Sequence, residues 1–416
     1  MSDEQASLQR KVVGILASTQ VLGGVGYSAG LAVGALLAQD ISGSTNLAGL
    51  GGTFQVIGGA LLAIPMARIM ASRGRGPGLA FGYLSAIAGA IGLIAAAVLR
   101  NFPLLLAASI LFGGASASNN QAGYAATDLA TPARRGRDLS LVVWATTIGS
   151  VLGPNLVGPS TPIARMLHVP TLAGPYAISC VGLALAVVVL VVRLRPDPLL
   201  EARRYAAAEV TDDVPGVLHG SVTRGLRFAT THPGALLGLL TLALGHAVMV
   251  SVMIMTPVHM HEGHAALTVI GLVISIHIVG MYAFSPLVGL AVDRLGGRPV
   301  ALVGSAILVV ATFLASTTPM GESGILTLAL FLLGLGWSCT YVSGSTMLTA
   351  ATPTAERPGV QGASTLVMGL AGGGGGALGG YVVGHFSYQA LSLASVVIAI
   401  SVGVMVLSIP KPEPAV

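Results

Sequence analysis

Charged residues are scarce in this sequence: Asp, Glu, Lys and Arg make up 8% of its 416 residues, whereas 54% are hydrophobic. A soluble domain carries about 25% charged residues, so this composition excludes a water-soluble globular fold. The apolar runs extend over about 20 residues, the length that an α-helix needs to cross a bilayer, and they lack the alternation of barrel strands. The sequence therefore predicts an all-α polytopic membrane protein.

Cysteine is also nearly absent. Cys180 and Cys339 both lie within apolar runs, so no disulfide framework is indicated. Neither a nucleophile–base arrangement nor a closed metal site is recognisable, and we expect a protein that is not an enzyme and has no resident cofactor. The net charge of +5 follows from basic residues placed around the membrane, so we expect no nucleic-acid partner.

Polar breaks divide the chain into twelve expected transmembrane spans, with a polar segment of about forty residues after the sixth. The spans lie near residues 12–37, 47–70, 78–99, 103–127, 139–161, 172–193, 234–257, 267–291, 299–318, 325–349, 360–384 and 388–409. The predicted domains are an N-terminal six-helix half (1–194), a cytoplasmic linker (195–233) and a C-terminal six-helix half (234–416).

The basic residues predict the orientation of these spans. Placing the N-terminus in the cytoplasm leaves 18 of the 20 Lys and Arg residues on that side, with Arg100 and Arg165 outside. This is the arrangement that the positive-inside rule favours. We therefore expect a multi-pass protein of a bacterial cytoplasmic membrane, with both termini cytoplasmic. We expect it to be a monomer in the lipid bilayer.

The two halves repeat one another. Pro65 and Pro286 are 221 residues apart, and the same offset joins the Thr-Pro pairs at 131–132 and 352–353. Paired six-helix halves are a known transporter plan, with the substrate site near the membrane midplane. Between spans eight and nine, residues 289–298 read GLAVDRLGGR. This stretch resembles the signature cytoplasmic loop of the major facilitator superfamily, G-x-x-x-D-R-x-G-x-R.

The resemblance covers essentially the whole chain and implies the major facilitator fold, twelve transmembrane helices in two pseudo-symmetric six-helix halves. In that family the loop forms a conformational latch, which is assigned here to Asp293, Arg294 and Arg298 and, in the first half, to Arg73 and Arg75. The first copy has Ala71 where the acid belongs. A charged turn that anchors helix ends explains that copy equally well.

Methionine and histidine supply an unusual set of polarisable side chains at membrane depth. Met249 and Met253 in span seven have i,i+4 spacing, as do His277 and Met281 in span eight, so each pair occupies one helix face. Thioether sulfur with imidazole favours Cu(I) over hard cations such as Mg²⁺. Spacing alone is weak support, because Met66 and Met70 repeat the spacing in span two without a nearby histidine.

Four more histidines mark a predicted metal entry route: His246 on the face of the span-seven methionines, and His259, His261 and His264 beside Glu262 in the joining loop. A solvated loop with a chance group of histidines is the alternative.

MxxxM on span seven with HxxxM on span eight resembles the CcoA-type copper importers, a branch of the superfamily. The resemblance implies that Met249, Met253, His277 and Met281 are the transport ligands. The predicted function is therefore a secondary transporter that imports copper, as Cu(I), by alternating access and passes it to a cytoplasmic copper chaperone.

Two other functions stay open. One is proton-coupled import or export of a small organic solute, riboflavin-like or drug-like. The glycine-proline motif at 149–155 favours it, although close helix packing explains that motif too, and so do polar residues on other spans: Gln20, Asn119, Asn120, Gln121 and Tyr341. The other is a metal sensor, which would need a large soluble output domain that the sequence does not offer.

Overall fold

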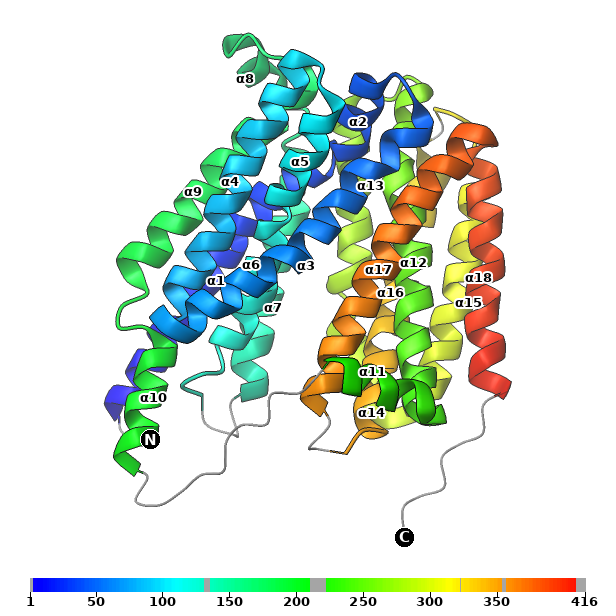
Figure 1. Cartoon of the computed structure of the whole chain (residues 1–416). Coiled ribbons are helices and arrows are strands. Elements are labelled where there is room, and N and C mark those ends of the chain that lie inside the picture. Colours follow the sequence, from blue (N-terminus) through cyan, green and yellow to red (C-terminus); the bar gives the residue numbers. More distant parts are fainter. Residues whose placement is uncertain (1–2, 131–134, 210–221, 322, 354–356, 409–416) are drawn as a thin grey trace. The chain divides into compact units, whose positions relative to one another are not determined.

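The computed structural model describes residues 3–130, 135–209, 222–321, 323–353 and 357–408 (Figure 1). Every regular element in this part of the chain is a helix. Among the described residues, eleven helical segments are long and apolar enough to cross a membrane. The helix at the expected fifth span, α7 (Arg135–Asn155), is not among the eleven. The prediction of an all-α protein is confirmed for the described residues.

The chain divides into two compact units, of which the first comprises Met1–Ser42 and Phe54–Gly216. Its helices are α1 (Asp3–Leu31), α2 (Gly34–Ser42), most of α3 (Ala48–Arg73), α4 (Arg75–Leu99), α5 (Phe102–Phe112), α6 (Gly114–Ala125), α7, α8 (Thr161–Met166), the 3₁₀ turn η2 (Thr171–Ala173), α9 (Gly174–Arg193) and α10 (Pro198–Glu209).

Small residues let α7 pack closely against α1 in the first unit. A Cβ added to Gly149 would lie 3.0 Å from the Gly24 Cα, and one added to Gly153 would lie 2.8 Å from the Ala29 backbone nitrogen. Such contacts are typical of helix pairs in lipid, where small residues allow the backbones to approach. The glycine-proline motif at 149–155 therefore has a packing role in this structure.

The second unit comprises Gly43–Thr53 and Val217–Val416. Its helices are the 3₁₀ turn η1 (Thr45–Leu47), the first turns of α3, α11 (Val222–Thr231), α12 (Pro233–Glu262), α13 (Leu267–Tyr282), α14 (Ser285–Leu295), α15 (Gly297–Ser316), α16 (Gly324–Ala350), α17 (Arg357–His385) and α18 (Tyr388–Ser408). The chain therefore passes between the units at both ends of Gly43–Thr53 and again within the segment 195–233, which was expected as a linker and which contains α10 and α11.

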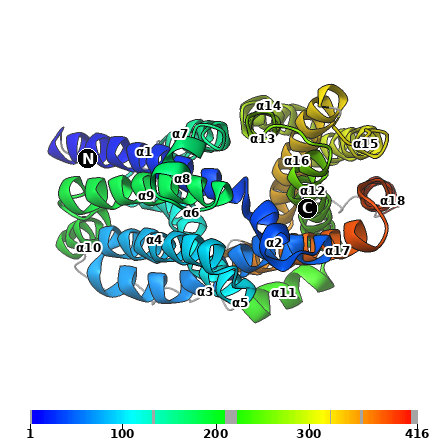
Figure 2. The ribbon, with the colours of Figure 1, turned by 90° about the horizontal axis from the view of Figure 1, so that it is seen from above.

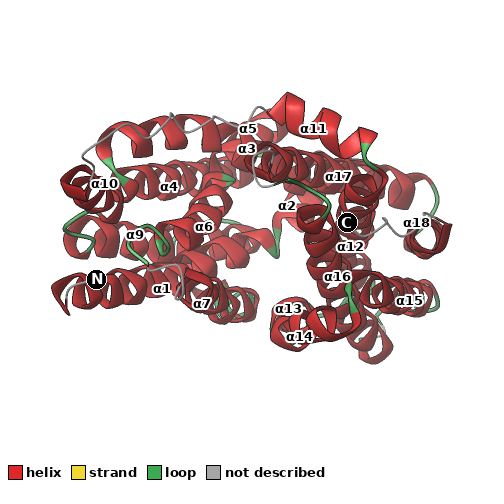
Figure 3. Ribbon diagram, turned by 90° about the horizontal axis from the view of Figure 1, so that it is seen from below, coloured by secondary structure: helices red, strands yellow, loops and turns green. Residues whose placement is uncertain are grey.

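Helix α16 is central to the second unit. Figures 2 and 3 view the ribbon from opposite ends, and both show α16 between α12 and α13. α12 packs mainly against α16 and α17, whereas α13 packs mainly against α16 and touches α12 little. The helices that carry the two predicted ligand pairs are therefore joined through α16.

Candidate metal site

Helices α12 and α16 run antiparallel and in close contact. A Cβ added to Gly238 of α12 would lie 2.8 Å from the Leu348 Cα, and one added to Gly245 would lie 2.9 Å from the Thr340 Cβ. The two glycines leave room for α16, as small residues do between membrane helices. The position of each α12 residue along α16 follows from these two contacts.

The predicted ligands of α12 lie farther along the same helix. Met249 and Met253 follow Gly245 by four and eight residues. With a rise of 1.5 Å per residue, they lie about 6 Å and about 12 Å beyond it along the axis. Because α16 runs in the opposite direction, these two methionines are level with the part of α16 near residues 332–336.

The predicted ligands of α13 reach the same part of α16. A Cβ added to Gly334 would lie 2.9 Å from the Met281 backbone nitrogen. One turn earlier, the His277 side chain contacts the Leu330 carbonyl. His277 and Met281 are thus level with residues 330–334 of α16. The structure brings both pairs to a similar depth, on the two helices that flank α16.

His277 has the hydrogen bonding expected of a metal-ligating histidine. Its ring is fully buried, and Nδ1 lies 2.7 Å from the Leu330 carbonyl oxygen. A carbonyl oxygen can only accept, so Nδ1 carries the proton and donates it. In the neutral ring Nε2 is then an acceptor, and it is buried without a hydrogen-bond partner. Met249 and Met281 are also buried, and Met253 is half-buried.

Trp337 of α16 contacts both of the helices that carry predicted ligands. Its indole N–H donates to Nδ1 of His246 at 3.0 Å, and its ring meets Tyr282 of α13 edge-on at 5.8 Å. Trp337 therefore joins α12 to α13 across one face of α16. Met253 lies seven residues after His246, so it projects from α12 in nearly the same direction, and this direction also faces Gly372 of α17.

His246 presents no free lone pair in this conformation. Indole N–H groups only donate, so Nδ1 of His246 accepts and the proton of the neutral ring sits on Nε2. Nε2 lies beside Gly372 of α17, where an added Cβ would come within 2.8 Å. To ligate a metal, His246 would first have to give up its hydrogen bond to Trp337. Its place in an entry route stays a prediction.

The histidines expected in the joining loop are divided between the interior and the surface. α12 continues to Glu262, so His259 and His261 belong to its last turns. His259 is buried, stacks on Tyr388 at 4.3 Å and has Nε2 3.3 Å from the Thr318 carbonyl oxygen, whereas His261 and His264 are exposed. Within the described residues, no three His, Cys, Asp or Glu side chains are grouped to hold a metal ion. The loop's role in metal entry stays a prediction.

In the first unit, the loop expected to act as a latch is held by acids from other segments: Asp128 follows α6 and Asp197 precedes α10. Arg75 donates from Nε and Nη2 to both carboxylate oxygens of Asp128, at 2.8 and 2.9 Å. Asp197 accepts from the Gly76 backbone nitrogen at 2.8 Å, near the start of α4. Sequence reasoning missed both carboxylates, because it looked for an acid at position 71. The sequence could have indicated these two carboxylates, because Asp128 and Asp197 lie just after the expected spans four and six.

The other latch residues lie at or near helix ends. Arg73 is exposed at the end of α3, and Asp293 and Arg294 are exposed on the last turn of α14. Gly296 has a φ of 86°, a conformation that suits glycine, and it allows the sharp turn into α15, where Arg298 is half-buried. A switching role for these residues stays a prediction.

Most of the polar residues that favour an organic solute lie in the first unit. Gln20 donates to the Asn119 carbonyl and to the Thr146 hydroxyl, both at 2.9 Å, and Tyr83 donates to the Asn119 side chain at 2.8 Å. Tyr341 lies in the second unit, where it stacks on Trp337 with ring centroids 4.9 Å apart. The ring contacts of Trp337 with these two tyrosines, edge-on with Tyr282 and stacked with Tyr341, were not foreseen from the sequence.

The family model of the Major Facilitator Superfamily matches residues 16–266 and 237–416. Among curated proteins, two from Bacillus subtilis (strain 168) are similar over most of the chain. The uncharacterized MFS-type transporter YddS is 39% identical over 398 residues, covering 96% of this chain and 90% of YddS. The uncharacterized MFS-type transporter YdeG is 39% identical over 396 residues, covering 94% and 90%.

Solved structures show the same fold at low identity. A bacterial homologue of the human lysosomal transporter Spinster, inward-facing and unoccupied, has a TM-score of 0.72 at 14% identity, with full coverage of both chains. A POT family transporter in complex with 5-aminolevulinic acid has a TM-score of 0.71 at 14% identity, with 96% of each chain covered. These matches confirm the predicted fold class. The chain belongs to the Major Facilitator Superfamily and is a multi-pass membrane transporter.

Proposed function

We propose that this transporter imports copper, as Cu(I), with ligands on α12 and α13. The observation that carries the proposal is His277, whose buried Nε2 has no partner while Nδ1 donates to the Leu330 carbonyl. A buried polar atom without a partner costs about 1–3 kcal/mol. A metal-ligating histidine almost always donates its other ring N–H in this way, because that bond fixes the tautomer and the ring orientation.

The other proposed ligands suit a soft ion that must also leave. Met249, Met253 and Met281 offer thioethers at a depth similar to that of His277, and thioether sulfur selects Cu(I). Their coordination offsets the cost of taking a cation out of water into the membrane interior. Thioethers carry no charge, so they form weaker bonds than a cage of thiolates would and allow the ion to exchange.

The remaining parts of the proposal concern direction and partners. Alternating access would expose the ligands to each side of the membrane in turn. With both termini in the cytoplasm, as the positive-inside rule favours, stronger thiol ligands on a copper chaperone would withdraw the ion there. We propose a monomer in a bacterial cytoplasmic membrane.

The experiment is ⁶⁴Cu uptake by cells at matched membrane abundance. A variant with Leu at Met249, Met253 and Met281 and Ala at His277 is compared with the unaltered protein. The control is Met66→Leu/Met70→Leu, because this buried pair has the same spacing but contacts Ser118 and Arg75 in the first unit. We expect uptake to be lost in the ligand variant alone. Equal uptake by all three proteins would overturn the proposal.

A specific observation favours the second candidate, transport of a small organic solute. Trp337 stacks with Tyr341 and meets Tyr282 edge-on, and Tyr341 is 39% exposed. Aromatic rings in this arrangement offer a stacking surface for a planar molecule. Uptake of labelled riboflavin that is lost in Trp337→Leu but kept in Met253→Leu would support this function and count against copper.

A further inference from the structure

Gln55 of α3 and Tyr176 of α9 are buried side chains of the first unit whose polar atoms have no hydrogen-bond partner among the described residues. Gln55 is 1% exposed, and both its Oε1 and its Nε2 lack a partner. Tyr176 is fully buried, and its hydroxyl lacks a partner. Burying a donor or acceptor in this way costs free energy, so such groups in a native protein need an explanation.

The two side chains converge beside Gly34, the buried first residue of α2. A Cβ added to Gly34 would lie 3.2 Å from Gln55 Nε2 and 3.7 Å from the Tyr176 hydroxyl oxygen. Apart from the adjoining residues and nearby backbone of the same helix, no other atom of the described residues lies within 4 Å of that position. A single atom beside Gly34 therefore reaches both polar groups.

Close packing holds the Tyr176 hydroxyl in this place. A Cβ added to Gly30, one turn before Gly34, would lie 2.8 Å from the Tyr176 ring. Phe112 of α5 meets the same ring edge-on, with the ring centroids 5.6 Å apart. The ring thus lies against Gly30 and its hydroxyl extends to Gly34, so a rotation of the side chain toward another partner would meet close neighbours.

Gly34 also follows a break in the first expected span. α1 ends at Leu31 and α2 begins at Gly34, and at the break the Val33 backbone N–H donates to the Gly30 carbonyl at 3.3 Å. Breaks in membrane helices are tolerated where neighbouring side chains or ordered waters satisfy the backbone groups that are freed. A polar position beside Gly34 suits this requirement.

We propose that an ordered water molecule binds beside Gly34 and bridges Gln55 to Tyr176. The water accepts from Gln55 Nε2 and exchanges a second hydrogen bond with the Tyr176 hydroxyl, which joins α3 to α9 next to the start of α2. Buried waters make two to four such bonds to groups that otherwise lack partners. Both side chains are neutral, which favours water over an ion. This inference is independent of the transported substrate.

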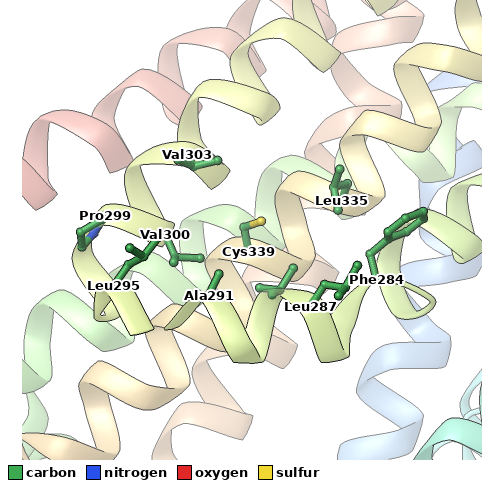
Figure 4. Close-up of a pocket in the computed structure, with 10 residues that line it drawn as sticks. Phe284, Leu287, Ala291, Leu295, Pro299, Val300, Val303, Leu335 and Cys339 are labelled. Atoms are coloured by element: carbon green, nitrogen blue, oxygen red, sulfur yellow. The ribbon is translucent and has the colours of Figure 1, made fainter. Parts of the chain in front are cut away.

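The apolar groove of the second unit provides a contrast. It has a volume of about 300 Å³ and lies between α14, the start of α15 and the middle of α16 (Figure 4). The thiol of Cys339 is the one hydrogen-bonding side chain among its ten lining residues. A buried water needs at least two polar partners, so this larger space does not meet the requirement that the position beside Gly34 meets.

X-ray hydroxyl-radical footprinting of the purified full-length protein tests for the water directly. The X-ray pulse converts bound water into hydroxyl radicals, which oxidise an adjacent tyrosine that bulk solvent does not reach, and mass spectrometry measures each rate. Tyr83 is the matched control, because it is also fully buried but donates its hydroxyl to Asn119 at 2.8 Å. We expect Tyr176 to be oxidised several-fold faster than Tyr83. Equal rates would overturn the inference, and this comparison requires no variant to fold.

Two substitutions at Gly34 provide a second test. Gly34→Ala places a methyl group where the water binds and leaves both polar groups without a partner. Gly34→Ser places a hydroxyl within reach of Gln55 Nε2 and the Tyr176 hydroxyl, so it replaces the water. The same two substitutions at Gly14 of α1, where an added Cβ meets no described atom within 4 Å, measure the ordinary difference between alanine and serine in a helix.

We expect both Gly34 variants to slow the oxidation of Tyr176 to the rate of Tyr83. Gly34→Ser should melt several degrees above Gly34→Ala after the difference measured at Gly14 is subtracted, because only the serine restores the lost hydrogen bonds. Equal melting temperatures after this subtraction, or unchanged oxidation of Tyr176 in Gly34→Ala, would overturn the inference.

Discussion

Trp337 donates its indole N–H to Nδ1 of His246 across 3.0 Å and thereby joins α16 to α12 beside the candidate metal site. The bond fixes the tautomer of His246 and turns its protonated Nε2 toward Gly372. His246 therefore supports the position of α12 in this conformation, while the unpartnered imidazole nitrogen belongs to His277.

The Trp337–His246 pair should show coupling in stability. We expect Trp337→Phe and His246→Leu each to lower the free energy of unfolding by about 1–3 kcal/mol, because each leaves a partly buried polar group without its partner. The double variant should cost less than the sum of the two, since it removes both partners. Thermal unfolding of the four proteins in detergent measures the coupling. Additive effects would show that the hydrogen bond contributes nothing.

Met253→Leu is the most informative single substitution among the proposed ligands. Leucine has a volume close to that of methionine, so a half-buried site should tolerate it at a cost below about 1.5 kcal/mol. It removes the sulfur, and we therefore expect ⁶⁴Cu uptake to fall by about tenfold at unchanged membrane abundance. Met66→Leu, at the buried methionine of span two, should leave uptake unchanged. Full uptake by Met253→Leu would remove Met253 from the ligand set.

Much of the fold follows from the sequence, because the length of an apolar run and the position of the basic residues beside it can be read from a short segment without knowing the tertiary contacts. Apolar runs of membrane length and the loop at 289–298 were enough to predict an all-α transporter of this superfamily, and the family match confirms it. Breaks within spans were less visible. The fourth expected span, 103–127, is built from two helices, α5 and α6, which meet at Gly113. The Gly113 backbone N–H donates to the carbonyls of Ser109 and Leu111 at the end of α5.

The candidate site was predictable only in its residue types. Spacing places Met249 and Met253 on one face of a helix, but it cannot show that α16 lies between α12 and α13. The bonds of His246 and His277 depend on which α16 residues face them, and those contacts join positions 53 to 91 residues apart. The ion pair of Arg75 with Asp128 was missed for the same reason, since Asp128 lies in the turn after α6, 53 residues from Arg75.

Gly334 tests whether the packing of α13 on α16 positions the site. A Cβ at this position would lie 2.9 Å from the Met281 backbone nitrogen and against the His277 carbonyl, so Gly334→Ala must push α13 away. We expect a loss of about 1–3 kcal/mol in stability and reduced ⁶⁴Cu uptake. Gly374→Ala is the control, because nothing lies within 4 Å of its added Cβ. Wild-type stability and uptake in Gly334→Ala would contradict the close contact.

Arg75 and Arg73 are two residues apart, but Arg75 forms a largely buried ion pair whereas Arg73 is exposed. Arg75 and Asp128 side chains are 17% and 11% exposed, so Arg75→Gln leaves a largely buried carboxylate without its bidentate partner. We expect this change to cost about 1–3 kcal/mol in the free energy of unfolding, whereas Arg73→Gln, at an exposed position, should stay within about 0.5 kcal/mol of the unaltered protein. Asp128→Asn added to Arg75→Gln should recover part of the loss, because the second change neutralises the unpaired carboxylate. Thermal unfolding in detergent and ⁶⁴Cu uptake are measured for the unaltered protein and the three variants. Equal effects of the two arginine changes would show that the loop holds its helices without the ion pair.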